Sequence, residues 1–346
     1  MSSVRANLPW VEKYRPKKVS DISSQEEVTG ALRSSIASGN LPHLLFYGPP
    51  GTGKTSTILA CCRELYGLEL MKTRVLELNA SDDRGISVVR TKIKTFAQTS
   101  VGNETYLGLP VPPFKIIILD EADTMTETAQ AALRRTIEDH SRITRFCLIC
   151  NYVSRIIEPL TSRCAKFRFK PIPSEPLLKR LESVASQENI TLGEGTLNAL
   201  HEASGGDMRK ALTYMQGASQ LVSGGVDDLK SSEECTIEVQ HVHLLAGKIP
   251  FDVLANFWVA AFGGRFDDVQ VQVKNLCAEG YSVSALLECL VEDIVRSPPD
   301  RLNDAQKSKM LIKIAECDKC LADCADEELQ LMDVGAQILL ACRKMP

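Results

Sequence analysis

The sequence predicts an α/β domain with a parallel sheet and flanking helices, followed by two smaller all-helical pieces. Four short apolar runs alternate with amphipathic stretches over residues 1–170, and this alternation is typical of a parallel α/β sheet. The runs lack the period-two pattern of a half-exposed strand, as expected when helices cover both faces of the sheet. The composition is that of a globular chain, with 346 residues, 44% hydrophobic and 24% charged.

The α/β domain is predicted to contain four strands with helices between them. The strands are His43–Tyr47, Arg74–Leu78, Lys115–Leu119 and Arg145–Cys150, and the helices are Thr55–Leu65, Ile86–Ala97 and Thr126–Glu138. Pro171 and Pro173 then break any helix and mark a domain junction. The predicted domain therefore covers residues 1–170.

Beyond the junction no segment has a convincing strand pattern, and all predicted elements are helices. A break rich in Gly, Ser and acidic residues at 223–234 separates two groups of them. The first group is Leu177–Glu188, Glu194–Ala203 and Met208–Val222, and the second is Phe251–Phe262, Phe266–Ala278, Ser282–Val295, Ala305–Ala325 and Glu327–Arg343. We predict one helical domain over residues 171–235 and another over 236–346.

Charge and hydropathy restrict the classes of function. The longest apolar runs, such as Ile116–Leu119, are far shorter than the ~20 residues of a membrane helix. No apolar stretch of a secretory signal follows Met1, so we expect an intracellular protein without a membrane partner. The net charge of −4 is unlike that of a free-standing DNA-binding protein. Any contact with nucleic acid would come from a local patch or from a larger assembly.

Two groups stand out among the 12 cysteines. Cys147 and Cys150 lie three apart on a predicted strand, so they point to opposite faces and do not bind one ion. Cys317, Cys320 and Cys324 have the spacing of one helical stripe. These three could hold a metal ion or pack as small residues in a reducing compartment, and we favour packing.

Residues 48–55 match the phosphate-loop pattern G-x-x-x-x-G-K-[ST], with a strand before the loop and a helix after it. Successive backbone N–H groups and a helix N-terminus form an anion-binding site. We expect Lys54 to reach the β- and γ-phosphates and the Thr55 hydroxyl to bind Mg²⁺. The pattern therefore predicts a site for a nucleoside triphosphate.

Two carboxylates follow the apolar strand that ends at Leu119. Asp120 is placed to hold Mg²⁺ through water, and Glu121 to orient and polarise an attacking water. Alternatively, both cap the helix that begins near Thr126. Asn151 ends the next predicted strand, where its amide could hold the water or the γ-phosphate, or simply serve a turn.

Several basic residues could contact phosphates. Arg163 and Arg209 could place positive charge on a γ-phosphate or form surface ion pairs, and Asp207 can cap the helix at Met208. A further basic patch, in which Arg90 and Lys94 are i, i+4 neighbours on a predicted helix, could follow a nucleic-acid backbone or form a solvated helix face. The basic residues of this patch are Arg84, Arg90, Lys92 and Lys94, beside a predicted buried stripe of Ile86, Val89, Ile93, Phe96 and Ala97.

These motifs together resemble AAA+ ATPases, and specifically the small subunits of the eukaryotic clamp loader, replication factor C. They span residues 9–209 in the order and spacing of that family. They are Pro9–Pro16, the phosphate loop, Leu78–Gly85, Asp120–Asp123, Ala132–Arg135, Ser162–Cys164 and Gly206–Arg209. Phe146–Tyr152 and Cys317–Asp323 resemble the branch called subunit 4 in animals.

The resemblance implies an ATP hydrolase that is active within its complex. Val11 and Arg15 would lie at the adenine side, Asn151 and Arg209 would sense the nucleotide, and Arg163 would act in trans on a neighbouring subunit's ATP. Lys54, Asp120 and Glu121 would be the catalytic residues of the chain's own site. The phosphates would be wrapped by Gly48, Pro49, Pro50, Gly51, Thr52, Gly53, Lys54, Thr55 and Ser56.

The resemblance also implies partners and a location. The chain would join one large and three other small subunits in a heteropentamer through its C-terminal collar, while a helical lid would respond to the nucleotide state. The complex would open the sliding clamp, proliferating cell nuclear antigen, and load it onto primer–template DNA in the nucleus, for replication and repair. Arg84, Arg90 and Lys94 would track the template strand.

Two other functions compete with this one. A homo-oligomeric AAA+ DNA motor or remodelling ATPase would need pore or wedge elements. The long insertion Gln98–Pro113 has the Gly and Pro content of a loop. An adaptor that binds nucleotide without turnover is disfavoured by the presence of Glu121 and Arg163.

Overall fold

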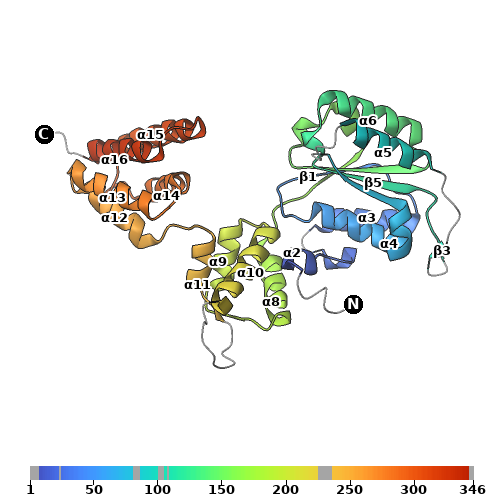
Figure 1. Cartoon of the computed structure of the whole chain (residues 1–346), viewed down its shortest axis with the longest axis horizontal. Coiled ribbons are helices and arrows are strands. Elements are labelled where there is room, and N and C mark those ends of the chain that lie inside the picture. Colours follow the sequence, from blue (N-terminus) through green and yellow to red (C-terminus); the bar gives the residue numbers. More distant parts are fainter. Residues whose placement is uncertain are drawn as a thin grey trace. The chain divides into compact units, whose positions relative to one another are not determined.

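The structure is a computed structural model that describes residues 8–22, 25–80, 86–99, 105–106, 109–224 and 236–342. The chain divides into two compact units, residues 1–238 and 239–346. The first contains a parallel sheet and a group of helices, and the second is helical (Figure 1). Our division of the chain into three domains, at 170/171 and 235/236, stays a prediction.

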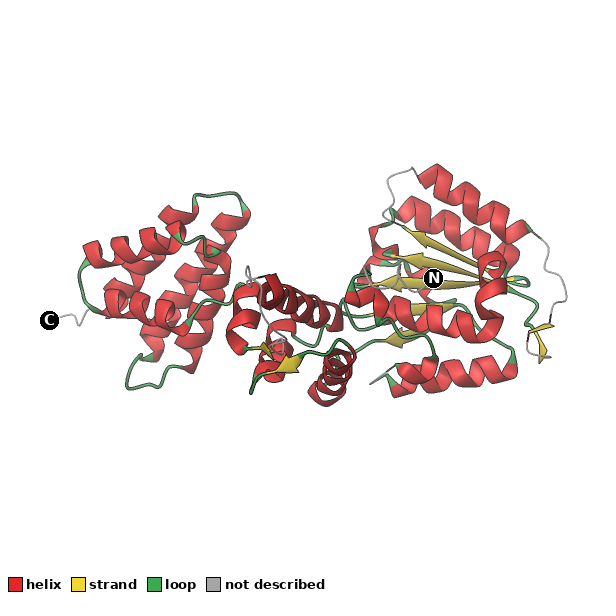
Figure 2. Ribbon diagram, turned by 60° about the horizontal axis from the view of Figure 1, so that its bottom comes forward, coloured by secondary structure: helices red, strands yellow, loops and turns green. Residues whose placement is uncertain are grey.

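Five parallel strands form the sheet in the order β2-β5-β6-β1-β7. Figure 2 draws the strands in yellow between the helices that cover them. They are β1 (Leu44–Tyr47), β2 (Val75–Asn79), β5 (Lys115–Asp120), β6 (Thr144–Cys150) and β7 (Ala165–Arg168). The first four confirm the prediction to within one residue at each end. Strand order reverses beside β1, and ligands of open α/β sheets bind at such a point.

The edge strand β7 was not predicted from the sequence. Its residues alternate between half-buried and exposed, with Lys166 and Arg168 at the exposed positions. A short strand with charged residues at alternate positions lacks the continuous apolar run that marks the central strands of a parallel sheet.

Helices cover both faces of the sheet (Figure 1). They are α3 (Glu26–Ser38) and α4 (Lys54–Arg74) on one face, and α5 (Ile86–Gln98) and α6 (Glu127–His140) on the other. Cys147 packs in the core under α3 and α4, and Cys150 in the opposite core, as the strand alternation predicts. The sequence prediction omitted α3. It ended the phosphate-loop helix at Leu65, close to a kink at Gly67 (φ 66°, ψ 177°).

Short elements join these layers. They are α2 (Trp10–Lys13), η1 (Val19–Asp21), η2 (Ala122–Thr124), η3 (Val153–Arg155) and α7 (Glu158–Thr161). The insertion Gln98–Pro113, predicted as a loop, contains a two-residue antiparallel pair, β3 (Thr105–Tyr106) with β4 (Leu109–Pro110).

The remainder of the first unit is mainly helical. Its helices α8 (Ser174–Gln187), α9 (Thr196–Ser204) and α10 (Met208–Gly224) confirm the three predicted there. We call this group the lid helices. A parallel pair of two residues each, β8 (Thr191–Leu192) with β9 (Thr236–Ile237), is an exception to the all-helical prediction. Residues 225–234 of the predicted break lie outside the described residues.

The second unit packs its helices around one core that includes Phe257, Leu290 and Ile338. The helices α12 (Phe251–Phe262), α13 (Phe266–Ala278), α14 (Val283–Arg296), α15 (Asp304–Ala322) and α16 (Glu327–Cys342) agree closely with the prediction, which omitted α11 (Val239–Leu245). None of the helices in the described segments is long and apolar enough to span a membrane.

The predicted cysteine stripe is only partly correct. Cys317 is buried in the core of the second unit. Helix α15 ends at Ala322, so Cys324 lies beyond the helix, exposed, with a φ of 67°. The described residues contain no group of three His, Cys, Asp or Glu side chains that could hold a metal ion.

Candidate active site

Parallel pairing brings the predicted polar groups to one edge of the sheet. Tyr47 pairs with Cys150, so the phosphate loop and Asn151 leave neighbouring strands side by side. Leu119 pairs with Leu148 on the other side of β6, so Asp120 reaches the same edge. The carboxyl ends of β1, β5 and β6 therefore meet as the sequence predicts.

The phosphate loop needs glycine where other atoms approach its backbone closely. Gly51 has a φ of +66°, and a Cβ there would lie 1.6 Å from Oδ1 of Asp207. At Gly48 a Cβ would lie 2.2 Å from the carbonyl oxygen of Phe169. The loop is therefore packed against Asp207, just before α10, on one side and against the chain leaving β7 on the other.

Lys54 lies between the loop and the end of β6. Its Nζ donates to the carbonyl oxygens of Gly48 and Pro49, each at 2.7 Å, and to Oδ1 of Asn151 at 3.0 Å. The residue is 8% exposed, and this burial lowers the pKa of Lys54, while the charge of Asp120 opposes the shift. The ammonium group thus links the loop to the amide predicted as a sensor.

Thr55 and Asp120 form a direct contact across the site. The Thr55 hydroxyl donates to Oδ2 of Asp120 at 2.7 Å, and Oδ1 of Asp120 accepts from the Glu121 N–H at 2.9 Å. Hydroxyl and carboxylate oxygens are the ligands that Mg²⁺ prefers, so the pair fits that ion.

The alternative role of the two carboxylates as helix caps is wrong. The N-cap of α6 is Thr126, whose side chain accepts from the Ala129 N–H. Glu121 instead is exposed, lines the pocket, and has a φ of 53°. A non-glycine residue in this left-handed region is strained, a feature that clusters at functional sites.

Asp123 is a positioning residue that the motif analysis did not single out. Its Oδ2 accepts from the backbone N–H groups of Asn151, at 3.1 Å, and Tyr152, at 3.2 Å. The carboxylate thereby fixes the chain where it leaves β6. The sequence could have indicated it only as the third residue after Asp120, because the contact depends on the pairing of β5 with β6.

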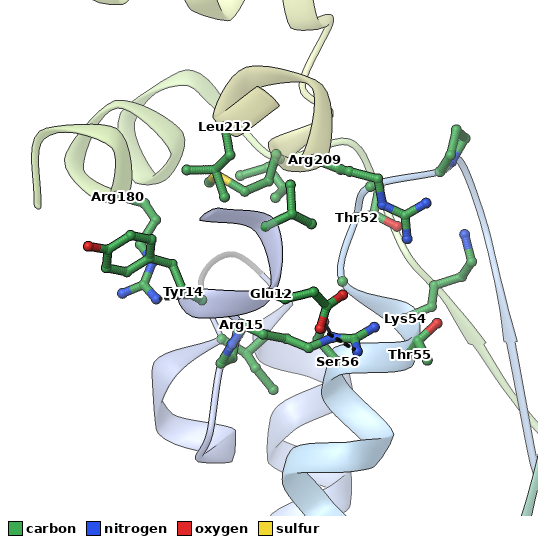
Figure 3. Close-up of a pocket in the computed structure, with 18 of the residues that line it drawn as sticks. Glu12, Tyr14, Arg15, Thr52, Lys54, Thr55, Ser56, Arg180, Arg209 and Leu212 are labelled. Atoms are coloured by element: carbon green, nitrogen blue, oxygen red, sulfur yellow. Dashed lines mark hydrogen bonds and ion pairs between the residues drawn. The ribbon is translucent and has the colours of Figure 1, made fainter. Parts of the chain in front are cut away.

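The first turn of α10 closes the pocket from the lid side. Oδ1 of Asp207 accepts from the N–H groups of Arg209, at 2.8 Å, and Lys210, at 3.1 Å, which confirms the predicted cap. Arg209 and Leu212 line the pocket (Figure 3).

The N-terminal segment supplies another wall. Val11 and Arg15 both line the pocket, and Arg15 Nε donates to the Ser56 hydroxyl at 3.2 Å. Tyr14 and Arg180 lie at one end of the pocket, with Lys54 and Thr55 at the other (Figure 3).

The pocket gathers nearly all of the predicted residues of the chain's own site. These are Val11, Arg15, Pro50, Gly51, Thr52, Gly53, Lys54, Thr55, Ser56, Asp120, Glu121, Asn151 and Arg209. Gly48 and Pro49 contribute the carbonyl groups that bind Lys54. The pocket also has lining residues that were not predicted: Glu12, Tyr14, Pro16, Asp21, Ile22, Ile172, Arg180, Met208 and Leu212.

Arg163 does not line this pocket, as far as the described residues define it. It follows α7, and its Nη2 forms an ion pair with Oε1 of Glu138 at 2.5 Å. Its Nη1 donates to the carbonyl oxygen of Pro159 at 2.7 Å. Arg134 Nε shares the same Glu138 oxygen at 3.0 Å.

The predicted DNA-contacting residues are only partly described. Lys94 is exposed on α5, while Ile93 and Ala97 are buried, in agreement with that part of the predicted stripe. Arg90 belongs to α5, but its side chain is not described, and Arg84 lies outside the described residues.

Replacement of Gly51 by alanine is expected to damage the site. The new Cβ would overlap Asp207 in a backbone conformation that costs a residue with a side chain about 1–3 kcal/mol. We expect a lower unfolding temperature of the full chain and weaker binding of MgATP, measured by thermal unfolding with and without the nucleotide. The control is Gly30→Ala in α3, where a Cβ meets nothing within 4 Å and alanine should stabilise by about 0.5–1 kcal/mol. Unfolding like that of the wild type in Gly51→Ala would contradict the prediction.

Comparisons with known proteins agree with this geometry. Residues 44–172 match the ATPase family associated with various cellular activities (AAA), and residues 252–337 match the replication factor C C-terminal domain. Replication factor C subunit 2 of Schizosaccharomyces pombe is 49% identical, over 98% of this chain and 96% of its own. Replication factor C subunit 4 of Homo sapiens is 52% identical, over 96% of this chain and 88% of its own. The names divide between subunits 2 and 4, and the predicted subunit 4 branch is among them.

A solved structure extends the comparison to the fold. RuvB of Thermotoga maritima is 16% identical, with a TM-score of 0.52 over 80% of this chain and 91% of that one. At this identity the likeness shows a shared fold alone. The relatives, by contrast, match almost the whole chain at about half identity. The chain therefore belongs to the replication factor C small subunits, AAA+ ATPase subunits of the clamp loader in DNA replication.

Proposed function

We propose that this chain binds ATP with Mg²⁺ in the pocket described above and hydrolyses it within a heteropentameric clamp loader. The observation that carries the proposal is the contact of Thr55 with Asp120, beside the phosphate loop and Lys54. A loop for phosphates, a cation and a pair of metal-binding oxygens then lie together at the switch point of the sheet.

The Thr55 hydroxyl and the Asp120 carboxylate would hold the magnesium ion. When bound, Mg²⁺ neutralises charge on the β- and γ-phosphates. Lys54 would contact the same phosphates, since its Nζ already lies against the loop carbonyls. Asn151 is positioned beside Lys54 and would report the state of the γ-phosphate to β6 and, through Asp123, to β5.

Glu121 would orient the attacking water and accept its proton, because it lines the pocket and immediately follows Asp120. Arg209 would contact the phosphates from the first turn of α10. Arg163 would complete the ATP site of a neighbouring subunit. Its ion pair with Glu138, away from the chain's own pocket, supports this role in trans.

The remaining proposals concern partners and location. We propose one large and three other small subunits as partners in the ring, and the sliding clamp, proliferating cell nuclear antigen, as its cargo. Primer–template DNA would be contacted by Arg84, Arg90 and Lys94, a role supported by the exposed position of Lys94 on α5. The complex would act in the nucleus, in DNA repair as well as replication.

The native mass and composition of the complex purified through a tag on this chain test the assembly. Five different subunits of related sequence, one of them larger, are expected for the clamp loader. A ring of identical copies would instead favour the homo-oligomeric DNA motor.

A further inference from the structure

Helix α2, which forms part of the pocket wall, is too short to be stable without contacts to the rest of the unit. It has four residues, its N-cap Pro9 provides no side-chain cap, and none of its residues is fully buried. Helices much shorter than about 12 residues are unstable alone. Yet α2 and the residues after it supply Val11, Tyr14 and Arg15 to the pocket. Contacts with the rest of the unit must therefore hold this wall in place.

Two short contacts converge on Glu188, the C-cap residue directly after α8 of the lid helices. Oε1 of Glu188 accepts from Nζ of Lys13 at 2.6 Å and from the Tyr14 hydroxyl at 2.5 Å. The hydrogen bond that Lys13 donates to Glu188 raises the pKa of Lys13. Burial and then Glu188 raise the pKa of Tyr14, so both groups keep their protons and donate at neutral pH.

Two further hydrogen bonds join the same segment to the lid helices. Nη2 of Arg180 donates to the Tyr14 carbonyl oxygen at 2.8 Å, and the Trp10 N–H donates to Oε1 of Gln216 in α10 at 3.0 Å. We call this set of contacts the clasp, formed by Trp10, Lys13 and Tyr14 with Arg180, Glu188 and Gln216.

The other side of the segment is attached to the phosphate-loop helix. Arg15 Nε donates to the Ser56 hydroxyl at 3.2 Å, and Arg63 Nη1 donates to the Pro16 carbonyl oxygen at 3.2 Å. Residues 10–16 therefore bridge α4 and the lid helices. A bridge attached at both ends holds Val11 and Arg15 at a fixed distance from the loop.

We infer that Glu188 is a positioning residue that sets the affinity of the pocket for nucleotide by clasping α2 to the lid helices. The inference rests on the proposed ATP site. Glu188 is not among the lining residues of the pocket, so it acts through α2. When only a fraction of molecules has the wall in place, the apparent Kd rises by the inverse of that fraction.

Glu188→Gln tests the inference in the full chain, with MgATP and MgADP titrated by calorimetry. The amide keeps the shape but loses the charge shared by Lys13 and Tyr14, so we expect both Kd values to rise about tenfold. The factor should be the same for ATP and ADP, because Tyr14 lies at the end of the pocket away from Lys54 and Thr55 (Figure 3). A merely destabilised chain would lower the unfolding temperature without this matched change in Kd.

The control is Glu175→Gln in the first turn of α8, the helix that Glu188 follows. Glu175 pairs with Lys179 within α8, with both side chains largely exposed, so its loss should leave both Kd values unchanged. The exchange Lys13→Glu with Glu188→Lys restores the ion pair and should recover part of the lost affinity. Tyr14→Phe removes a single hydroxyl, with little risk to folding, and should weaken both nucleotides by a smaller, equal factor.

The outcomes separate the clasp from the ATP site itself. Wild-type Kd values in both Glu188→Gln and Tyr14→Phe would overturn the inference while leaving the site intact. A loss for ATP but not for ADP would also overturn it, since that result places the effect at the γ-phosphate. Failure of the wild-type chain to bind either nucleotide would refute the proposed site, and with it the premise of the clasp.

Discussion

Replacement of Glu121 by glutamine is expected to slow ATP hydrolysis at this subunit by about 10²–10⁴-fold while ATP binding is retained. The amide has the size of the carboxylate but cannot accept a proton from the attacking water. Lys54, Thr55 and Asp120, which we assign to the phosphates and the metal ion, keep their contacts with one another in the variant.

The measurement is single-turnover hydrolysis of γ-labelled ATP by the assembled complex. In Glu121→Gln, the ATP bound at this subunit should remain unhydrolysed while the other subunits turn over their ATP. Glu127→Gln is the matched control, because Glu127 is an exposed glutamate in the first turn of α6, a few residues along the chain. Unchanged turnover at this subunit in Glu121→Gln would remove Glu121 from the mechanism.

Replacement of Arg163 by alanine is expected to slow hydrolysis at a neighbouring subunit's site by about 10³–10⁵-fold. A guanidinium group aimed at the γ-phosphate stabilises the charge that develops in the transition state. In this chain Arg163 pairs with Glu138 and stays out of the chain's own pocket. Its loss should therefore leave nucleotide binding by the chain itself unchanged.

Two assays distinguish action in trans from action in cis. Binding of ATP by the isolated chain should be equal in wild type and Arg163→Ala, while the variant complex should lose turnover. Arg142→Ala, an exposed arginine in the turn before β6, controls for the loss of a surface charge. If the isolated Arg163→Ala chain instead bound ATP more weakly than the isolated wild-type chain, Arg163 would act in cis.

The sequence predicted the catalytic edge of the sheet well, for a simple reason. Each group there follows a buried apolar strand, and parallel strands deliver their carboxyl ends to one edge. Knowing the strands was therefore enough to place Lys54, Asp120 and Asn151 together. The same logic placed Cys147 and Cys150 on opposite faces, which the two cores of the sheet confirm.

The sequence could not predict contacts that depend on how separate elements pack. Arg180 and Glu188 reach the pocket wall only because α8 docks beside α2, more than 160 positions away in the chain. Nothing in the hydrophobic period of α8 marks Arg180, or Glu188 directly after the helix, among the neighbouring polar residues. The cysteine stripe failed for a local reason, since α15 ends at Ala322 and leaves Cys324 outside the helix.

The edges of the sheet bear on how the chain behaves when it is produced without partners. An edge strand can recruit a strand from another molecule, and this pairing is a common route to aggregation. The edge strands here are β2 and β7, each of five residues or fewer, and they carry Glu77 on one side and Lys166 with Arg168 on the other as exposed charges. Short length and charge both oppose such pairing. Lys166 and Arg168, which kept β7 from being predicted as a strand, should therefore help the isolated subunit to stay in solution.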